Sequence, residues 1–173
     1  MCIRDRHIVT AQYFRDTRTP EQFAQYHAKN SFLHDINNEG PHKNATYKAH
    51  MLQLESFVMI QFTDEATVIP SNSSWFEAFP DPEPDAPPAL TTVPLRESQL
   101  YRDDWIGLRE LDRRGALVFG TCAGAHMHLS DECRTATWGR FLGPPPLRDE
   151  LRRALPRFPL VYVLVVCMVV YVR

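Results

Sequence analysis

The chain has 173 residues, which at about 150 residues per domain is enough for one domain but not for two. Hydrophobic residues make up 44% and charged residues 23% of the chain, a composition typical of a globular protein with a buried core. The formal net charge of −2 excludes binding to nucleic acid through a broadly basic surface. Neither GxGxxG nor GxxxxGK[ST] occurs, so the common nucleotide-binding signatures are excluded and no cofactor is predicted.

The first part of the chain is predicted to be helical with intervening loops. Thr19 is suited to cap a helix that begins with Pro20, because a threonine oxygen accepts a backbone N–H and proline is favoured at the first helical position. A helical pattern resumes over residues 44–56.

Two short apolar runs follow. Residues 57–62 read FVMIQF and predict a strand buried on both faces, and residues 116–119 read ALVF and predict a second short buried strand. Between them residues 100–111 predict a helix that ends at Gly115 in the left-handed conformation. Residues 130–142 predict a last helix capped by Ser130. Helices alternating with strands indicate an α/β fold with a parallel sheet.

Functional residues of parallel sheets gather where the strands end. Asp64 and Glu65 follow the first predicted strand, and His126 lies in the loop after the second. In the catalytic triad of α/β-hydrolases the acid also precedes the histidine along the chain. In such a triad the acid orients the imidazole and the histidine transfers the proton of the nucleophile.

The nucleophile is the missing member of this constellation. No serine of the chain lies in GxSxG, whereas Gly120 to Gly124 fit GxCxG around Cys122. One loop would then have to present both this thiol and His126, so we interpret Cys122 as a packed thiol. It could pair with Cys133, but four scattered cysteines without CxxC favour separate thiols in the core.

The motif HxH at His126 and His128 is compatible with metal binding, but no third histidine or carboxylate has a recognisable ligand spacing. We therefore predict no metal site.

Several spaced motifs run through the chain and together carry a resemblance. They are Phe32-Leu33-x-Asp35-Ile36-Asn37, Asn44-x-Thr46-Tyr47-Lys48, Phe57-Val58-Met59, Pro70, Ser73, Trp75-Phe76, Pro94-Leu95-x-Glu97, Leu100-Tyr101, Asp104, Gly107-Leu108, Asp112, Gly115, Leu117-Val118-Phe119, Gly124-x-His126-x-x-Leu129-Ser130 and Phe141-Leu142-Gly143. From Val9 to Gly143 the chain thus resembles the C-terminal portion of a palmitoyl-protein thioesterase, a lysosomal α/β-hydrolase.

The resemblance implies the C-terminal part of an α/β-hydrolase fold, with late parallel strands and flanking helices, preceded by the end of a helical insertion. It divides the chain into residues 1–6, which match nothing in the family, residues 7–56 as the end of the helical insertion, residues 57–143 as the C-terminal half of the hydrolase domain, and residues 144–173 as an unmatched basic and then hydrophobic tail.

The function that the resemblance implies is removal of palmitate and other long-chain fatty acyl groups from S-acylated cysteines of proteins, in the lysosome, by a Ser-His-acid triad. Its partners would be S-acylated proteins or peptides and fatty acyl thioesters. His126 matches the family's catalytic histidine and Glu65 its triad aspartate, with Asp64 as the acid if the loop register shifts by one. Trp75 and Phe76 could line an acyl groove or pack in the core. Because the serine is absent, we expect the chain by itself to be inactive.

Two other readings remain open from the residues. The chain could be a catalytically inert α/β fragment or an interaction half-domain that needs a partner chain. It could also belong to an esterase of other acyl substrates, because a fold does not fix the substrate.

The sequence offers three features that concern the cellular location of the protein, namely its two ends and a pair of glycosylation sequons. No apolar segment typical of a signal peptide follows Met1, whereas Asn44 and Asn72 lie in N-glycosylation sequons. Residues 160–172 carry no charge, but as a helix they would span only about 20 Å of a hydrocarbon core of roughly 30 Å. We predict no membrane anchor in this tail.

Overall fold

The structure is a computed structural model that describes residues 12–142, so the predictions for residues 1–6 and 144–173 lie outside the described residues. The α-helices and strands are α1 (Pro20–Lys29), α2 (Leu33–Ile36), α3 (Ala45–Met51), β1 (Phe57–Asp64), α4 (Gln99–Arg102), α5 (Leu108–Arg113), β2 (Leu117–Ala125), α6 (Asp131–Arg134) and α7 (Arg140–Leu142), and short 3-10 helices span Ser71–Trp75 and Leu95–Glu97. Within residues 12–142, no helix combines the length and apolar character that crossing a membrane requires.

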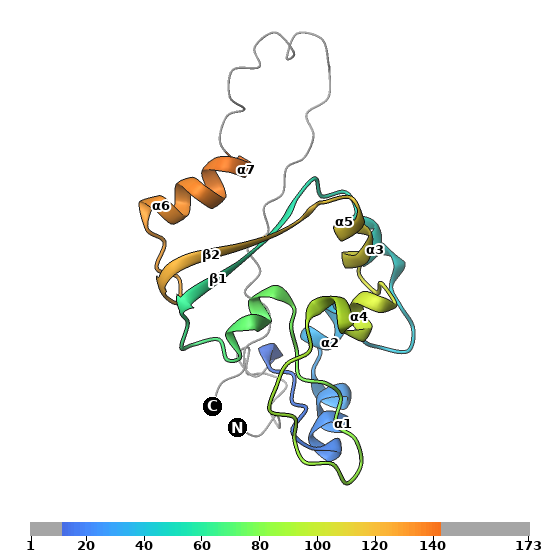
Figure 1. Ribbon diagram of the computed structural model, residues 1–173. Helices are drawn as coiled ribbons and strands as arrows, with labels where there is room; N and C mark the ends of the chain where they lie inside the picture. Colours follow the sequence, from blue (N-terminus) through green and yellow to red (C-terminus); the bar gives the residue numbers. More distant parts are fainter. Residues whose placement is uncertain (1–11, 143–173) are drawn as a thin grey trace.

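The two strands lie side by side and run parallel across the middle of the molecule (Figure 1). Phe57 pairs with Leu117 and the register continues to Phe62 opposite Cys122, after which it shifts before Asp64 meets Ala125. A parallel pair needs a long crossover, which here holds α4 and α5. This mixture of helices with a small parallel sheet agrees with the predicted α/β class.

Strand β1 separates two hydrophobic clusters, because successive side chains of a strand point to opposite faces. Phe57 and Met59 pack with residues of α5 and its surroundings, whereas Val58, Ile60 and Phe62 pack toward α6. All five side chains are buried. The prediction of a strand buried on both faces is therefore confirmed.

Strand β2 differs from its prediction. It has nine residues, beyond the predicted 116–119, and within it only Cys122 is buried. Phe119 is 40% exposed. Both strands have a single neighbour in the described sheet, so the difference lies in side-chain packing. The side chains of β1 belong to both hydrophobic clusters, whereas Leu117 and Val118 of β2 are only partly buried against them. A short apolar run in a sequence does not show how completely other elements will cover the strand.

The single helix predicted over residues 100–111 is wrong, because the chain breaks between α4 and α5. Asp104 there adopts a left-handed conformation with φ 55°. Its buried carboxylate contacts Lys48 Nζ at 2.6 Å and accepts the Arg109 N–H at 2.9 Å. Gly107 follows with φ 91°, a conformation that favours glycine. Asp104 thus accepts a backbone N–H of the first turn of α5 and is held in place by Lys48. These contacts stabilise the break more than a continuous helix would gain from the apolar periodicity of the sequence.

The predicted helix ends are confirmed where local chemistry sets them. Thr19 Oγ1 accepts the Gln22 N–H at 3.2 Å at the start of α1. Ser130 Oγ accepts the Cys133 N–H at 3.1 Å at the start of α6, and a π-helical turn over residues 135–139 links α6 to α7. Gly115 has φ 68° just after α5.

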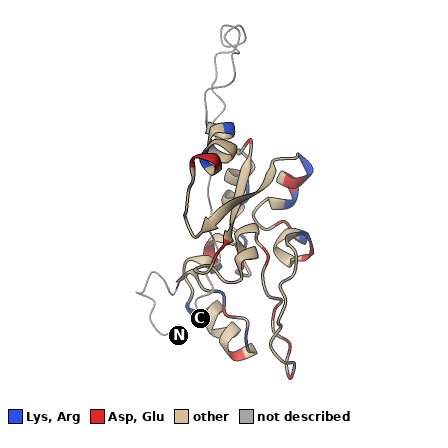
Figure 2. Cartoon of the chain, turned by 60° about the vertical axis from the view of Figure 1, so that its left-hand side comes forward, with Lys and Arg blue, Asp and Glu red and all other residues tan. Residues whose placement is uncertain are grey.

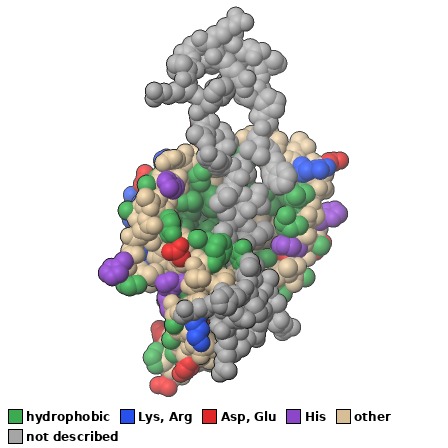
Figure 3. All heavy atoms as spheres, turned by 180° about the vertical axis from the view of Figure 1, so that it is seen from behind, with side chains coloured by type: hydrophobic (Ala, Val, Ile, Leu, Met, Phe, Trp, Pro, Cys, Tyr) green, Lys and Arg blue, Asp and Glu red, His purple; other side chains and the backbone are tan. Residues whose placement is uncertain are grey.

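Charged side chains gather on helices and loops, whereas the two strands carry a single carboxylate, Asp64 (Figure 2). Hydrophobic side chains form patches on the described part of the face seen in Figure 3. At the helical N-terminal end, Arg15 donates to Glu39 at 3.2 Å and to Asp81 at 2.6 Å, and the Tyr26 hydroxyl donates to Glu39 at 2.7 Å. This network joins α1 to the loop that crosses back from β1.

Candidate active site

The ends of the two strands bring the predicted acid and histidine together. Because β1 and β2 are parallel and Asp64 pairs with Ala125, the next residues along each strand, Glu65 and His126, emerge at the same edge of the sheet. The Nδ1 atom of His126 lies 2.7 Å from Oε2 of Glu65. The structure thus brings the acid and the histidine that the sequence singled out into direct contact.

The Glu65 carboxylate is the buried member of this pair, with a side chain only 1% exposed. Its second oxygen, Oε1, accepts the backbone N–H of Thr67 at 2.8 Å and that of Val68 at 2.9 Å. Burial by itself raises the pKa of the Glu65 carboxyl, but the hydrogen bonds from Val68, His126 and Thr67 together hold the pKa below its usual value. Glu65 is therefore an ionised acceptor at neutral pH.

An ionised carboxylate only accepts hydrogen bonds, so the Nδ1 atom of His126 is the donor and, in the neutral ring, Nε2 is the acceptor. The imidazole is 28% exposed and its edge packs against Phe62, with ring centroids 6.2 Å apart. A ring fixed on one side and reachable on the other is arranged to accept a proton at Nε2 from a group in solvent or on a substrate.

Asp64, the alternative acid, is exposed at the last position of β1. The carboxylate that contacts His126 is that of Glu65, its neighbour along the chain. Which of the two acts as the acid in catalysis stays a prediction that rests on this contact.

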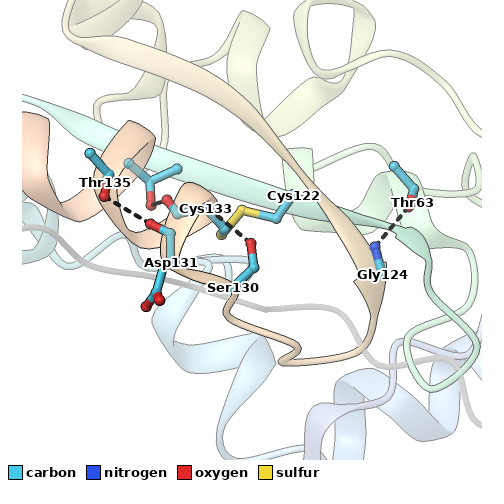
Figure 4. The surroundings of a disulfide bond; sticks show 8 residues. Thr63, Cys122, Gly124, Ser130, Asp131, Cys133 and Thr135 are labelled. Atoms are coloured by element: carbon cyan, nitrogen blue, oxygen red, sulfur yellow. Dashed lines mark hydrogen bonds between the residues drawn. A yellow bond between two sulfur atoms is a disulfide. The ribbon is translucent and has the colours of Figure 1, made fainter.

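Sequence reasoning missed the backbone contacts that shape this edge. The Gly124 N–H donates to Thr63 Oγ1 at 3.0 Å, and Gly124 has φ 107° (Figure 4). A Cβ atom at this position would lie 3.2 Å from the ring of His128. A glycine directly before a histidine loop is the sequence signal that could have indicated such a turn.

The interpretation of Cys122 and Cys133 as two separate thiols is wrong, because they form a disulfide with Cα atoms 5.4 Å apart (Figure 4). Both are buried. Cys122 is therefore no free thiolate, which agrees with its exclusion as a nucleophile. The spacing of the cysteines in the sequence did not predict this pair. Cys133 reaches Cys122 only because α6 packs beside β2 in the folded chain.

Trp75 and Phe76 lie away from the carboxylate–imidazole pair. The Trp75 ring packs edge-on against Phe119, with centroids 6.0 Å apart, and Phe76 lies 6.0 Å from Phe57 at the beginning of β1. The beginning and end of an eight-residue strand are about 23 Å apart. Phe76 also lines a cavity of about 280 Å³. Their contact with an acyl chain stays a prediction.

The two sequons differ in their surroundings. Asn44 is exposed and its side chain accepts the Thr46 N–H at 3.0 Å at the start of α3. The Asn72 side chain donates to Glu77 at 2.8 Å and accepts from Gln61 at 3.3 Å. Glycosylation of both asparagines stays a prediction, and the engaged amide makes Asn72 the less accessible acceptor.

Groups of three or more histidine, cysteine or carboxylate side chains that could hold a metal ion are absent from residues 12–142.

The parallel strands, with a buried carboxylate–histidine pair at their carboxyl ends, define an α/β protein equipped for acid–base chemistry. The sequence profile of the family described as Palmitoyl protein thioesterase matches residues 2–126. The chain belongs to this family, as its spaced motifs predicted.

Similar proteins carry names that agree with this family. The chain is 36% identical over 124 residues to Palmitoyl-protein thioesterase 1 of Caenorhabditis elegans, covering 72% of this chain and 39% of that protein. It is 35% identical over 126 residues to Palmitoyl-protein thioesterase 3 of Dictyostelium discoideum, covering 72% and 41%. It is 31% identical over 119 residues to Lysosomal thioesterase PPT2-B of Xenopus laevis, covering 68% and 38%. The chain thus spans about two fifths of the length of these relatives.

Proposed function

We propose that this chain supplies the acid and the base of a hydrolase that removes long-chain fatty acyl groups from S-acylated cysteines of proteins. The observation that carries the proposal is the 2.7 Å contact between His126 Nδ1 and the buried Glu65 carboxylate at the ends of adjacent parallel strands. Membership of the palmitoyl protein thioesterase family supports the acyl thioester as the substrate class. In this proposal the chain forms the C-terminal part of an α/β-hydrolase domain.

The nucleophile of the proposed enzyme is a serine outside these 173 residues, because none of their serines lies in GxSxG. The match to only about two fifths of the relatives supports this division of the triad. An enzyme that contains this chain together with that serine is called the complete enzyme below. The chain alone should not turn over acyl thioesters.

The proposed reaction has two halves that use the same imidazole. In the first, His126 Nε2 takes the proton of the serine hydroxyl as its oxygen attacks the thioester carbonyl, and returns this proton to the departing cysteine sulfur. The C–S bond breaks and an acyl-serine ester remains. In the second, His126 takes a proton from water as the water oxygen attacks the ester carbonyl, and then returns this proton to the serine oxygen as the C–O bond to serine breaks and the fatty acid leaves.

Glu65 has a separate part in this mechanism. Its ionised carboxylate accepts the Nδ1 proton, keeps Nε2 unprotonated before attack and stabilises the imidazolium afterwards. The two backbone hydrogen bonds from Thr67 and Val68 hold the carboxylate in place while the imidazole changes charge.

Lysosomal location is part of the proposal. Relatives named lysosomal thioesterases support it. The Cys122–Cys133 disulfide also supports it, because disulfides form in the oxidising secretory route rather than in the cytosol.

Substitution of the histidine tests the proposal. In the complete enzyme, His126→Ala should reduce kcat for a palmitoyl thioester by about a thousandfold or more, because it removes the proton acceptor. His128→Ala, which removes an exposed histidine two residues away, is the matched control and should leave kcat within a few-fold. Equal activity of His126→Ala and the wild type would refute the assignment. A preference for oxygen esters over thioesters would favour an esterase of other acyl substrates.

A further inference from the structure

The loop that carries His126 has almost no hydrophobic anchor of its own. The segment 123–132, called loop 123–132 below, comprises the end of β2, the connection to α6 and the beginning of α6. Each of its residues is exposed or half-exposed, and the buried positions on either side are Cys122 and Cys133. Leu129 is the loop's one side chain packed against the cluster around Val58. A surface segment with few buried apolar contacts opens at a low free-energy cost unless another restraint holds it.

The segment reaches β1 and the turn after it through the pairing of Ala125 with Asp64 and the contact of His126 with Glu65, and its other hydrogen bonds are few. The Gly124 N–H reaches Thr63 on β1 at 3.0 Å, and the His128 N–H donates to the Ala125 carbonyl at 2.9 Å. Met127 adopts φ 60°, a conformation that a non-glycine residue holds only when its surroundings impose it. The loop therefore needs a firm attachment at its far end if the imidazole is to stay beside Glu65.

That attachment is covalent. Cys122 lies on β2 four residues before His126, and Cys133 lies in α6 seven residues after it. Their disulfide closes the loop at its base, as Figure 4 shows for β2 and α6. α6 has only four residues, with Ser130 Oγ accepting the Cys133 N–H at its start, so the helix gives little rigidity by itself.

We propose that the Cys122–Cys133 disulfide is a positioning element for His126. It fixes both ends of loop 123–132 to the sheet and thereby keeps Nδ1 within hydrogen-bond distance of the Glu65 carboxylate. The proposal rests on the proposed function for its catalytic consequence, since a displaced imidazole cannot accept the nucleophile's proton. The restraint that the disulfide places on the loop does not depend on which substrate the enzyme cleaves.

The experiment compares the complete wild-type enzyme with two double variants, in a background where Cys2 and Cys167 are replaced by serine. Cys122→Ala/Cys133→Ala removes the cross-link and some volume, and Cys122→Val/Cys133→Val removes the cross-link but refills the space. Hydrogen exchange of residues 123–132 and the Nδ1 proton resonance of His126 are measured first. Turnover of a palmitoyl thioester, with kcat separated from KM, follows.

We expect both variants to exchange amide hydrogens in the loop at least about tenfold faster, while β1 keeps its protection, and to lose the Nδ1 resonance. We expect kcat to fall about tenfold or more with KM nearly unchanged, because positioning affects proton transfer more than binding. If the disulfide only stabilised the fold, its loss would instead raise exchange evenly over the whole chain. If it only filled space, the valine pair would restore the wild-type exchange and kcat.

Unchanged loop exchange and an intact Nδ1 resonance in the variants would overturn the inference. If loop exchange rises but the wild type does not cleave thioesters at all, the proposed function fails and the structural restraint survives. Should both variants fail to fold, the inference is tested by the same exchange measurement on wild-type enzyme whose disulfide has been reduced under native conditions. Faster exchange confined to the loop supports the inference, and unchanged exchange in fully reduced protein overturns it.

Discussion

The substitution Glu65→Gln separates catalysis from stability at the centre of the site. Glutamine keeps an oxygen that can accept the Thr67 and Val68 N–H groups, now held by the carboxylate at 2.8 and 2.9 Å. It places an NH₂ donor opposite His126 Nδ1, where the carboxylate oxygen now lies at 2.7 Å. The neutral imidazole must then carry its proton on Nε2, the nitrogen that accepts a proton in the proposed mechanism.

The magnitudes of the two effects differ widely. A wrong tautomer in a Ser-His-acid triad lowers kcat about ten-thousandfold, which corresponds to about 5.5 kcal/mol of transition-state stabilisation. Replacing a charge-assisted hydrogen bond by a neutral one costs about 1 kcal/mol of folding free energy, part of which is regained because no charge is buried. We therefore expect a nearly inactive enzyme whose unfolding free energy at neutral pH falls by no more than about 1 kcal/mol.

The assay is hydrolysis of a palmitoyl thioester by the complete enzyme, with urea unfolding of the same samples. Asp64→Asn is the matched control, because it makes the same chemical change at an exposed neighbour and should alter the unfolding free energy by less than about 0.5 kcal/mol. If Asp64→Asn abolishes turnover while Glu65→Gln retains it, the acid has been assigned to the wrong residue.

Two further outcomes follow from the same edge of the sheet. The pKa of Glu65 is lowered in the folded state, so its stabilisation is fully present above the pKa of an unfolded glutamate and is lost as the pH falls through the folded pKa. The unfolding free energies of wild type and Glu65→Gln, measured with urea, should therefore differ at neutral pH and converge once the pH is below the folded pKa. A difference that stays constant with pH would contradict this. Gly124→Ala forces φ 107° on an alanine and should lower the unfolding free energy by about 1–2 kcal/mol. Gly139→Ala is the control and should cost far less, because Gly139 has no positive φ. Equal costs would show that the turn at Gly124 tolerates a side chain.

Much of the local structure could be predicted because it depends on neighbours in the sequence. The continuous apolar run 57–62 specified a strand buried on both faces, and Thr19 and Ser130 specified helix starts through their own hydroxyls. The break before Gly107 was missed, since it depends on a salt bridge from Lys48 to Asp104 that brings together residues far apart in the chain.

For the candidate site, the sequence by itself determined the family, the residue types and their order, with an acid after one strand and His126 after the next. Only the tertiary structure decided that Glu65 rather than Asp64 faces the imidazole, because strand register and the turn beyond it set the direction of each side chain. It also decided that Cys122 is bonded to Cys133. Both are contacts between separate elements, and their geometry follows from packing across the sheet rather than from local periodicity.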